Sequence, residues 1–407
     1  MPTPSNAQPA VADTPTKVSF LRAETAGANW SELSPDLPAD STPEAQKKAQ
    51  QDAKTARKEL SDYLRTILTT PNLIVLAGSG ASLGKVGGPS MAKLWKDSSE
   101  LPKFAEIVAA VKQPEDDQWI ENLMSRCLAA RQFLDGDTKA LVSAFLAGAE
   151  KMIWNACSEF LPDADLSGHE TFLRRMARRR LRAPRLKLFT TNYDLCFETA
   201  AGRLGIILID GFSFTEMRRF DPRLFDYDIV RRAKGSDESN DFVEGVAQFF
   251  KVHGSVNWDR VGSEIVQAQI PKAPCLIYPA TAKYEQSYSQ PHLELMAQFQ
   301  SVLREPNTCL VTVGFGFNDN HLSAPILAAV KSNPSIKLLA VDREAVVRSR
   351  AGTGVYADLS KQIERGEADI TLLNADFAQF ADLIPQLRAL SPAEQIERSV
   401  KQIARES

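Results

Sequence analysis

Short, mostly apolar runs recur along this chain, and each one stops at glycine or polar residues before a helical pattern begins. The runs cover residues 72–77, 186–191, 206–209, 249–253, 309–313, 336–341 and 370–373. Runs of this length are typical of strands that are buried on both faces of a parallel sheet. Their alternation with helical patterns predicts an α/β fold built on a doubly wound, mainly parallel sheet.

Three segments lie outside this pattern. Residues 1–45 are rich in Pro, Ser, Ala and Asp without sustained periodicity, so we expect a mobile N-terminal arm followed by one domain over residues 46–407. Residues from about 95 to 182 carry helical patterns without a strand signal, which predicts a helical insertion. Residues from about 376 to 407 predict a helical C-terminal extension. The whole chain therefore reads as one Rossmann-like domain with helical additions.

Composition excludes several classes of protein. The net charge of -3 argues against an electrostatic grip of the whole chain on nucleic acid, so no direct nucleic-acid binding is expected. No leader pattern and no apolar run of about 18 residues is visible, which predicts a cytoplasmic protein. The five cysteines form no Cys-x-x-Cys pair, so we expect reduced thiols and no metal.

A glycine turn, Gly78-Ser79-Gly80-Ala81-Ser82, follows the first strand. Glycines let a turn pass tightly and let backbone amides approach a diphosphate, and a following helix adds its positive N-terminus. Glycines after strands also make plain turns, so both interpretations stay open. The candidate cofactor-binding residues here are Ala77, Gly78, Gly80 and Ser82.

The loop after the second strand reads Thr191-Asn192-Tyr193-Asp194 and combines a hydroxyl, an amide and a carboxylate. Such a cluster can orient a ribose or a water molecule. The alternative is helix capping, because Asn192 or Asp194 could cap a helix that starts near Leu195.

His253 ends the fourth run, beside Gly254. Histidine has an unperturbed pKa suited to general-base work near neutral pH. A lone histidine is more often a packed or surface residue, but the strand-end position of His253 favours a base. His169 and His292 have no such context, and we assign them no role.

A second glycine turn spans residues 314–321, and Asp342 follows the next strand. The amide and carboxylate side chains of the turn could hold ribose hydroxyls or could form a turn and an N-cap. Asp342 could take a ribose hydroxyl at a strand tip or cap a helix. The candidate ligand-binding residues of the turn are Gly314, Phe315, Gly316, Asn318 and Asp319. All these candidates follow predicted strands, where an open α/β sheet places its binding crevice.

The strongest run of charge extends from Arg174 to Arg182. On a helix it would spread positive charge around most of the circumference, which favours a solvated helix face. Binding of phosphate, nucleic acid or an acidic partner is the alternative.

Taken in this order, the motifs resemble the sirtuin-like family, specifically its bacterial branch of NAD hydrolases found in antiphage defence. Gly78–Ser82 looks like the family's Gly-Ala-Gly-x-Ser loop, and residues 87–90 look like its Gly-Ile-Pro segment. Residues 191–194 are similar to the Gln-Asn-x-Asp motif, with Thr191 in place of the amide. His253-Gly254 looks like the catalytic His-Gly.

Residues 314–321 resemble the Gly-x-Ser-x-x-Asp-x-His signature of the sirtuin-like branch, with Gly316 replacing the serine. Asp342 falls where sirtuins carry a residue near the adenosine. The matches span residues 73–342, and the arm, the insertion and the C-terminal region lie outside the resemblance.

The resemblance implies that NAD is the substrate and that nicotinamide leaves through an oxocarbenium-like transition state. It implies that Asn192 holds the nicotinamide ribose or the attacking water and that His253 acts as the general base. It also implies that Asp194 orients polar groups or stabilises developing positive charge. Deacylase sirtuins carry a zinc module with paired Cys-x-x-Cys motifs, which this chain lacks. We therefore expect an NAD glycohydrolase (NADase). A non-catalytic module that senses NAD or ADP-ribose and a zinc-free protein deacylase are the alternatives.

The resemblance also implies a role as the NAD-depleting effector of an antiviral defence system. It predicts a homo-oligomer that is activated by a separately encoded partner. A HerA-type hexameric ATPase is the first expectation for this partner, and an Argonaute-type protein is the second. Whether the product is linear or cyclic ADP-ribose stays open.

Overall fold

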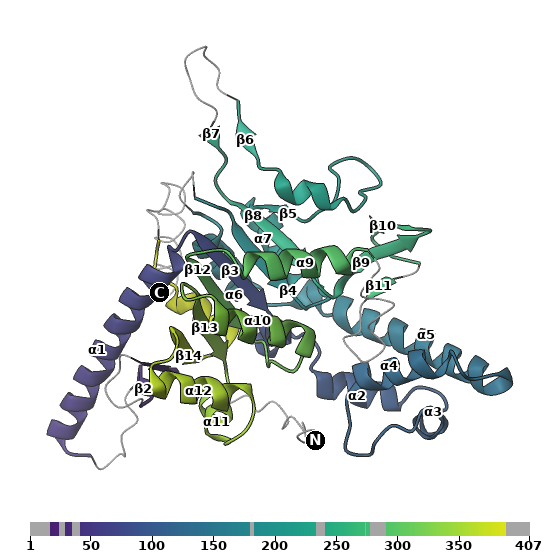
Figure 1. Ribbon diagram of the computed structural model, residues 1–407, viewed down its shortest axis with the longest axis horizontal. Coiled ribbons are helices and arrows are strands. Elements are labelled where there is room, and N and C mark those ends of the chain that lie inside the picture. The colour runs from purple at the N-terminus through teal and green to yellow at the C-terminus, as the bar shows by residue number, and fades with distance from the viewer. Residues whose placement is uncertain are drawn as a thin grey trace.

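The computed structural model describes residues 17–23, 29–34, 41–179, 183–232, 241–272, 274–276 and 290–387. Its centre is a nine-stranded sheet with the order β2-β1-β14-β13-β12-β3-β4-β8-β5 (Figure 1). The parallel strands are β3 (Asn72–Ala77), β4 (Leu186–Thr190), β5 (Ile207–Ile209), β8 (Val246–Lys251), β12 (Thr308–Val313), β13 (Lys337–Asp342) and β14 (Ile370–Asn374). The predicted mixed α/β fold with a largely parallel sheet is confirmed.

The apolar runs form central strands because both faces of the sheet are covered. Along β3, Leu73, Val75 and Ala77 belong to one hydrophobic cluster, whereas Ile74 and Leu76 belong to another on the opposite face. The first cluster includes side chains of α1 (Pro43–Leu68), α6 (Ser167–Met176), α7 (Cys196–Leu204) and α13 (Phe377–Leu383). The second includes α9 (His292–Val302), α10 (Asn320–Ser332), α11 (Ala345–Arg350) and α12 (Val355–Arg365). In Figure 1, α9 and α10 lie in front of the sheet.

The direction of winding reverses between β3 and β12. From β3 the chain first builds outward to β4, β5 and β8, and it later returns to β12, β13 and β14 on the other side. Such a switch point opens a crevice at the carboxyl ends of the two central strands, where open α/β sheets bind their ligands. The two predicted glycine turns follow these same two strands, so the topology brings them together.

Part of the expected mobile arm belongs to the sheet. Strand β1 (Ser19–Arg22) pairs antiparallel with β14, and β2 (Ser31–Glu32) pairs with β1. Phe20 and Leu21 are buried, and Asn374 Nδ2 donates to Lys17 O at 2.8 Å. The expectation of a mobile arm is wrong for these strands, because Phe20 and Leu21 contribute to the core. Residues 1–16, 24–28 and 35–40 lie outside the described residues.

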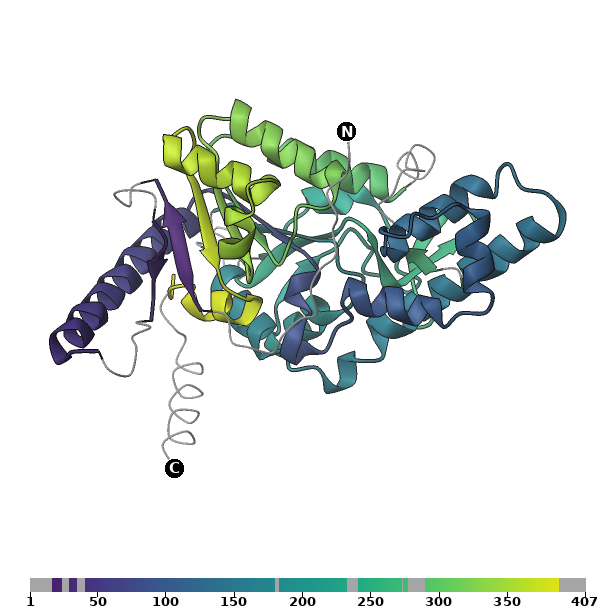
Figure 2. The same ribbon diagram turned by 90° about the horizontal axis from the view of Figure 1, so that it is seen from below.

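The helical insertion forms a separate hydrophobic cluster beside the sheet. Its helices are α2 (Met91–Ser99), α3 (Phe104–Ala110), α4 (Ile120–Ala130) and α5 (Gly136–Ser158). Figure 2 shows these helices at the opposite end of the molecule from α1. Helix α6 falls within the range expected for the insertion, but its side chains join the cluster that covers the main sheet. The part with its own core therefore ends with α5.

Several short elements complete the described chain. A three-stranded antiparallel sheet, which the sequence analysis did not predict, contacts α5; its order is β10-β9-β11. Its strands are β9 (Gly254–Val261), β10 (Glu264–Gln267) and β11 (Pro274–Leu276), and a separate pair consists of β6 (Val230–Arg231) and β7 (Asp241–Phe242). Four 3-10 turns are η1 (Ser79–Ala81), η2 (Gly84–Val86), η3 (Leu161–Asp163) and η4 (Pro222–Asp226). None of the described helices combines the length and apolarity that a membrane span requires.

Two arginines of the basic run cap other helices. Arg175 Nη1 donates to the carbonyls of Ala381, Asp382 and Ile384 at the end of α13, at 2.7–2.8 Å. Arg179 donates to the carbonyls of Leu68, Thr70 and Pro71 at the end of α1. The last carbonyls of a helix have no partner within the helix, and arginine can supply the donors. A purely solvated face is therefore wrong for Arg175 and Arg179, whereas residues 180–182 and 388–407 lie outside the described part of the chain.

Candidate active site

One cavity lies at the carboxyl ends of the central strands, and every predicted site residue except Ala77 lines it. The predicted residues that line it are Asn192, Asp194, His253, Gly78, Gly80, Ser82, Thr191, Gly314, Phe315, Gly316, Asn318, Asp319 and Asp342. Ala77 is fully buried at the end of β3, and its carbonyl accepts from Thr191 N at 3.1 Å. The structure therefore brings together side chains that are far apart in the sequence.

The two glycine turns touch each other through their backbones. Gly78 N donates to Val313 O and Gly80 N donates to Gly314 O, both at 3.0 Å. A Cβ atom on Gly80 would lie 2.6 Å from Gly314 Cα, and Gly314 has a φ of 59°. These glycines are needed because side chains would separate the turns. The amides of Gly78 and Gly80 serve this contact, so a diphosphate would need other donors.

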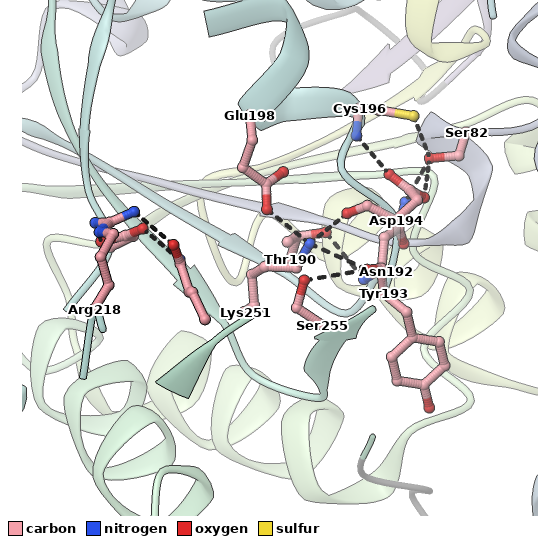
Figure 3. Close-up of polar contacts among 12 residues, drawn as sticks. Ser82, Thr190, Asn192, Tyr193, Asp194, Cys196, Glu198, Arg218, Lys251 and Ser255 are labelled. Atoms are coloured by element: carbon pink, nitrogen blue, oxygen red, sulfur yellow. Dashed lines mark hydrogen bonds and ion pairs between the residues drawn. The ribbon is translucent and has the colours of Figure 1, made fainter. Parts of the chain in front are cut away.

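Three polar side chains form a hydrogen-bonded network on one wall of the cavity (Figure 3). Ser82 Oγ donates to Asp194 Oδ2 at 2.7 Å, and Asn192 Nδ2 donates to Ser82 Oγ at 2.9 Å. Asp194 Oδ1 accepts from Cys196 N, the first residue of α7, at 3.0 Å. One carboxylate oxygen of Asp194 thus bonds to the first amide of α7, although Leu195 and not Asp194 occupies the N-cap position, while the other oxygen binds Ser82.

Asn192 has one side-chain oxygen without a hydrogen-bond partner among the described residues. The residue is buried, and its backbone N–H donates to Thr190 Oγ1 at 3.1 Å. Its Nδ2 is held by Ser82, but Oδ1 is buried without a hydrogen-bond partner among the described residues. A buried carbonyl oxygen without a donor costs free energy and calls for an explanation, and at Asn192 a bound ligand can supply the missing donor. The Asn192 side chain therefore fits a ligand that carries a hydroxyl donor.

His253 pairs with a second histidine. Strand β8 ends at Lys251, so His253 lies in the turn after the strand rather than at its end as predicted. Its Nε2 lies 2.9 Å from Nε2 of His321, and the two rings are stacked with centroids 5.0 Å apart. A hydrogen bond between two imidazoles needs one donor and one acceptor. One of these two nitrogens therefore carries a hydrogen and the other does not.

His292 joins the same cluster, although its sequence context indicated no role for it. Its ring centroid lies 6.0 Å from that of His321, and its Nδ1 lies 2.8 Å from Val252 O. Because a carbonyl oxygen can only accept, Nδ1 of His292 carries the hydrogen. Within the described residues, no group of three or more His, Cys, Asp or Glu side chains is arranged to hold a metal ion.

Asp342 lies at the end of β13 beside Arg348. Its Oδ1 accepts from Glu344 N at 2.7 Å, and its Oδ2 lies 3.6 Å from Arg348 Nη1. Burial raises the pKa of Asp342, and the Arg348 charge partly opposes this. A Cβ atom on Gly316 would lie 3.0 Å from Arg348 Nη1, so the glycine leaves room for the arginine. Arg343 and Arg348 also line the cavity, but they belong to no sequence motif that would have predicted this.

The insertion supplies another wall of the cavity. It contributes Met91, Leu94, Trp119, Glu121 and Cys157, none of which was predicted. Tyr193 OH donates to Glu121 Oε1 at 3.5 Å, which links α4 to the loop of Asn192 and Asp194. Burial raises the pKa of Cys157 to about 12, so its thiol is protonated near neutral pH. Sequence patterns place residues on helices but do not show which helix will pack over a distant loop.

Residues 187–353 match the family model of a SIR2-like domain. No curated protein matches the chain. Among solved structures, one from work on the mechanism and regulation of Sir2 enzymes is 10% identical, with a TM-score of 0.38, and the alignment covers 81% of this chain and 98% of that one. A mutant Sir2 homologue in complex with 2′-O-acetyl ADP ribose is 13% identical, with a TM-score of 0.33 and coverage of 80% and 96%.

The fold and the cavity define a doubly wound α/β protein with one polar site at the switch point of its sheet. The SIR2-like match covers less than half of the chain and runs from β4 to just beyond α11. It includes the site residues from Thr191 to Asp342 and leaves out the first glycine turn. This match supports a sirtuin-like family.

Proposed function

We propose that this protein is an NAD glycohydrolase, which cleaves NAD into nicotinamide and ADP-ribose without a metal. The observation that carries the proposal is the network of Ser82, Asn192 and Asp194, which lines the same cavity as His253. The SIR2-like match supports NAD as the substrate. Asp342 ends β13, whereas Asn192 and His253 follow β4 and β8 on the other side of β12 and β3. Asp342 is therefore the candidate partner of the adenosine ribose.

The proposed reaction breaks the bond between C1′ of the ribose and the nicotinamide nitrogen. The electron pair of this bond goes to the nitrogen, which neutralises the pyridinium ring and releases nicotinamide. The oxygen of a water molecule bonds to C1′, and one proton of this water passes to His253. The products are ADP-ribose and nicotinamide, and the proton is later returned to solvent.

Asn192, Asp194 and Ser82 have different roles in this reaction. Asn192 Oδ1, which has no partner in the part of the chain that the structure describes, would accept a hydrogen bond from a ribose hydroxyl or from the attacking water. The Asp194 carboxylate would stabilise the positive charge that develops on the ribose in the transition state. Ser82 keeps both groups in place because it bonds to each of them.

The pair of histidines limits how His253 can act as a base. If Nε2 of His253 donates to Nε2 of His321, then Nδ1 of His253 carries the lone pair and can accept a proton. In the reverse arrangement Nδ1 carries the hydrogen, and His253 cannot accept a proton without losing the contact. We assign the first arrangement to the competent protein, with His321 as the residue that selects the tautomer.

The proposal is tested by incubating purified protein with NAD and measuring the products by liquid chromatography. We expect equal amounts of nicotinamide and ADP-ribose, and the elution position distinguishes linear from cyclic product. His253→Ala should abolish nicotinamide release while the protein still unfolds cooperatively. If calorimetry shows that the protein binds NAD, but no nicotinamide is released even with a HerA-type or an Argonaute-type partner present, the result would instead favour a sensing module. Release that requires an acylated peptide would favour a deacylase.

For the biological role, we propose the NAD-depleting effector of an antiviral defence system, in a homo-oligomer with a separately encoded partner. A HerA-type hexameric ATPase is the first candidate for the partner, and an Argonaute-type protein is the second. Uncontrolled NAD hydrolysis would be toxic to the cell, so some restraint is expected. Residues of the insertion line the cavity, which supports the insertion as the segment that restrains NAD hydrolysis. The test compares nicotinamide release with and without each partner, and light scattering measures the oligomer.

A further inference from the structure

Lys251 is a buried cation directly beneath the loop that carries Asn192 and Asp194. It ends β8, opposite Thr190 of β4, and only 3% of its side chain is exposed. Burying an ammonium group is costly unless its donors are satisfied and its charge is balanced. No sequence motif pointed to a role for Lys251.

The ammonium group of Lys251 has three donors and three acceptors around it (Figure 3). Nζ donates to the carbonyl of Asp194, to the carbonyl of Tyr193 at 3.3 Å and to Glu198 Oε1 at 2.9 Å. Two of these acceptors are backbone carbonyls of the loop itself. A methionine could fill the same volume, but it would leave both carbonyls without this donor.

Lys251 is one of several groups that bond to the backbone of the loop from Thr191 to Asp194. Tyr193 O also accepts from Val256 N at 3.0 Å and from Ser255 Oγ at 3.4 Å. Thr191 N donates to the carbonyl of Ala77 at 3.1 Å. The Asp194 carbonyl accepts from Lys251 Nζ, so Lys251 helps to orient the residue that carries the carboxylate (Figure 3).

Glu198 on α7 balances the charge of Lys251. Burial raises the pKa of Glu198, and the nearby Lys251 ammonium opposes this rise. Its second oxygen, Oε2, is buried without a hydrogen-bond partner among the described residues, so Lys251 is the cation that this carboxylate contacts. The pair therefore places hydrogen-bond donors under the loop without adding net positive charge next to a ribose that becomes cationic in the transition state.

We propose that Lys251 is a positioning residue of the reacting centre. It holds the carbonyls of Tyr193 and Asp194 so that the Asn192 amide and the Asp194 carboxylate meet Ser82 at the cavity wall, and Glu198 neutralises its charge. This inference rests on the proposed function, because its kinetic consequence is a slower cleavage of NAD. Its structural consequence, a looser loop, is measurable without any activity.

The kinetic test compares three variants. Lys251→Met should lower kcat for nicotinamide release by about 10- to 100-fold with little change in KM, because small misplacements of reacting groups have effects of this size. The double variant K251M/E198Q removes the unpaired carboxylate and should recover thermal stability without recovering kcat. Lys187→Met is the control, since Lys187 is a partly buried lysine paired with Glu305 at 3.6 Å near the start of β4. It should keep wild-type kcat.

Hydrogen exchange tests the loop in the absence of turnover. The amides of Asn192 and Cys196 are bonded to Thr190 Oγ1 and Asp194 Oδ1, so they should exchange slowly in the wild-type protein. In K251M/E198Q we expect faster exchange in peptides that cover these residues, and in Lys187→Met we expect no change.

The outcomes separate the two proposals. Wild-type protein that releases no nicotinamide with its partners contradicts the proposed function, while faster exchange in the double variant still supports Lys251 as the residue that holds the loop. Unchanged exchange in the double variant overturns the inference about Lys251. Recovery of kcat together with stability in the double variant also overturns it, because Lys251 would then serve only to balance Glu198.

Discussion

Ser82 Oγ donates to Asp194 Oδ2 at 2.7 Å, although 112 positions separate the two residues in the chain. This bond joins the glycine turn after β3 to the loop after β4, and Ser82 also accepts from Asn192 Nδ2. The hydroxyl therefore orients both side chains that the proposed reaction needs.

Removing this hydroxyl should slow the reaction. A hydrogen bond to a charged group contributes about 1.5–3 kcal/mol, so Ser82→Ala should lower kcat by roughly 10- to 100-fold. Ser143→Ala is the control, because Ser143 Oγ bonds to Lys139 O within α5. The measurement is nicotinamide release at saturating NAD, and equal rates for Ser82→Ala and wild type would refute the role of this hydroxyl.

The contact between the glycine turns should be sensitive to a single methyl group. A Cβ atom on Gly80 would lie 2.6 Å from Gly314 Cα, so Gly80→Ala must push two backbones apart. Overpacking of this kind costs about 1–3 kcal/mol of unfolding free energy, which urea denaturation can measure. Gly202→Ala is the matched control, since a Cβ atom there meets nothing within 4 Å and helix α7 should gain about 0.5–1 kcal/mol. Wild-type stability of Gly80→Ala would contradict the packing.

The sequence predicted the parallel strands well because their signal is local. Strands such as β3 and β12 are buried along nearly their whole length, so each appears as a continuous apolar run that stops at a glycine turn. Knowing that parallel strands share an edge was enough to expect Asn192, His253 and Asp342 near one another. The cavity that they line agrees with this expectation.

The features that the sequence could not predict depend on contacts between distant segments. Strand β1 is only four residues long and gains its place by pairing with β14 near the other end of the chain. Arg175 looks like one member of a charge run until α13 presents its last carbonyls to it. The pairing of His253 with His321 likewise arises where the turn after β8 meets α10.

His169 should make the stability of the fold depend on pH. Its ring is fully buried between Phe197 and Phe377, and burial lowers its pKa from 6.5 to about 4, although the Asp194 charge opposes this. As the pH falls from about 6.5 towards 4, the unfolded chain binds a proton that the folded protein does not. Stability should therefore be lost in this window, by up to roughly 3 kcal/mol from this residue.

The variant His169→Phe isolates this effect, because phenylalanine does not titrate. Urea denaturation at about pH 7 and pH 4.5 should show a smaller loss of unfolding free energy for the variant than for the wild-type protein. An equal loss in both proteins would mean that His169 titrates normally in the folded state.

Trp119 should contribute to substrate binding from the insertion. It lines the cavity, and its Nε1 donates to Glu121 Oε2 at 3.4 Å. Loss of the aromatic ring should weaken binding by about 1.5 kcal/mol, which corresponds to a roughly tenfold higher KM for NAD with a similar kcat. Phe133→Ala serves as the control, since Phe133 belongs to the same insertion but is 85% exposed. An unchanged KM in Trp119→Ala would argue against a substrate contact from the insertion.

The most direct test of the reacting centre compares two asparagines. Asn192 and Asn257 each have a buried Oδ1 without a hydrogen-bond partner among the described residues, but of the two only Asn192 lines the cavity. Nicotinamide release from NAD should be abolished in Asn192→Ala and retained in Asn257→Ala, with cooperative unfolding in both variants. A folded Asn192→Ala protein that releases nicotinamide at the wild-type rate would contradict the assignment.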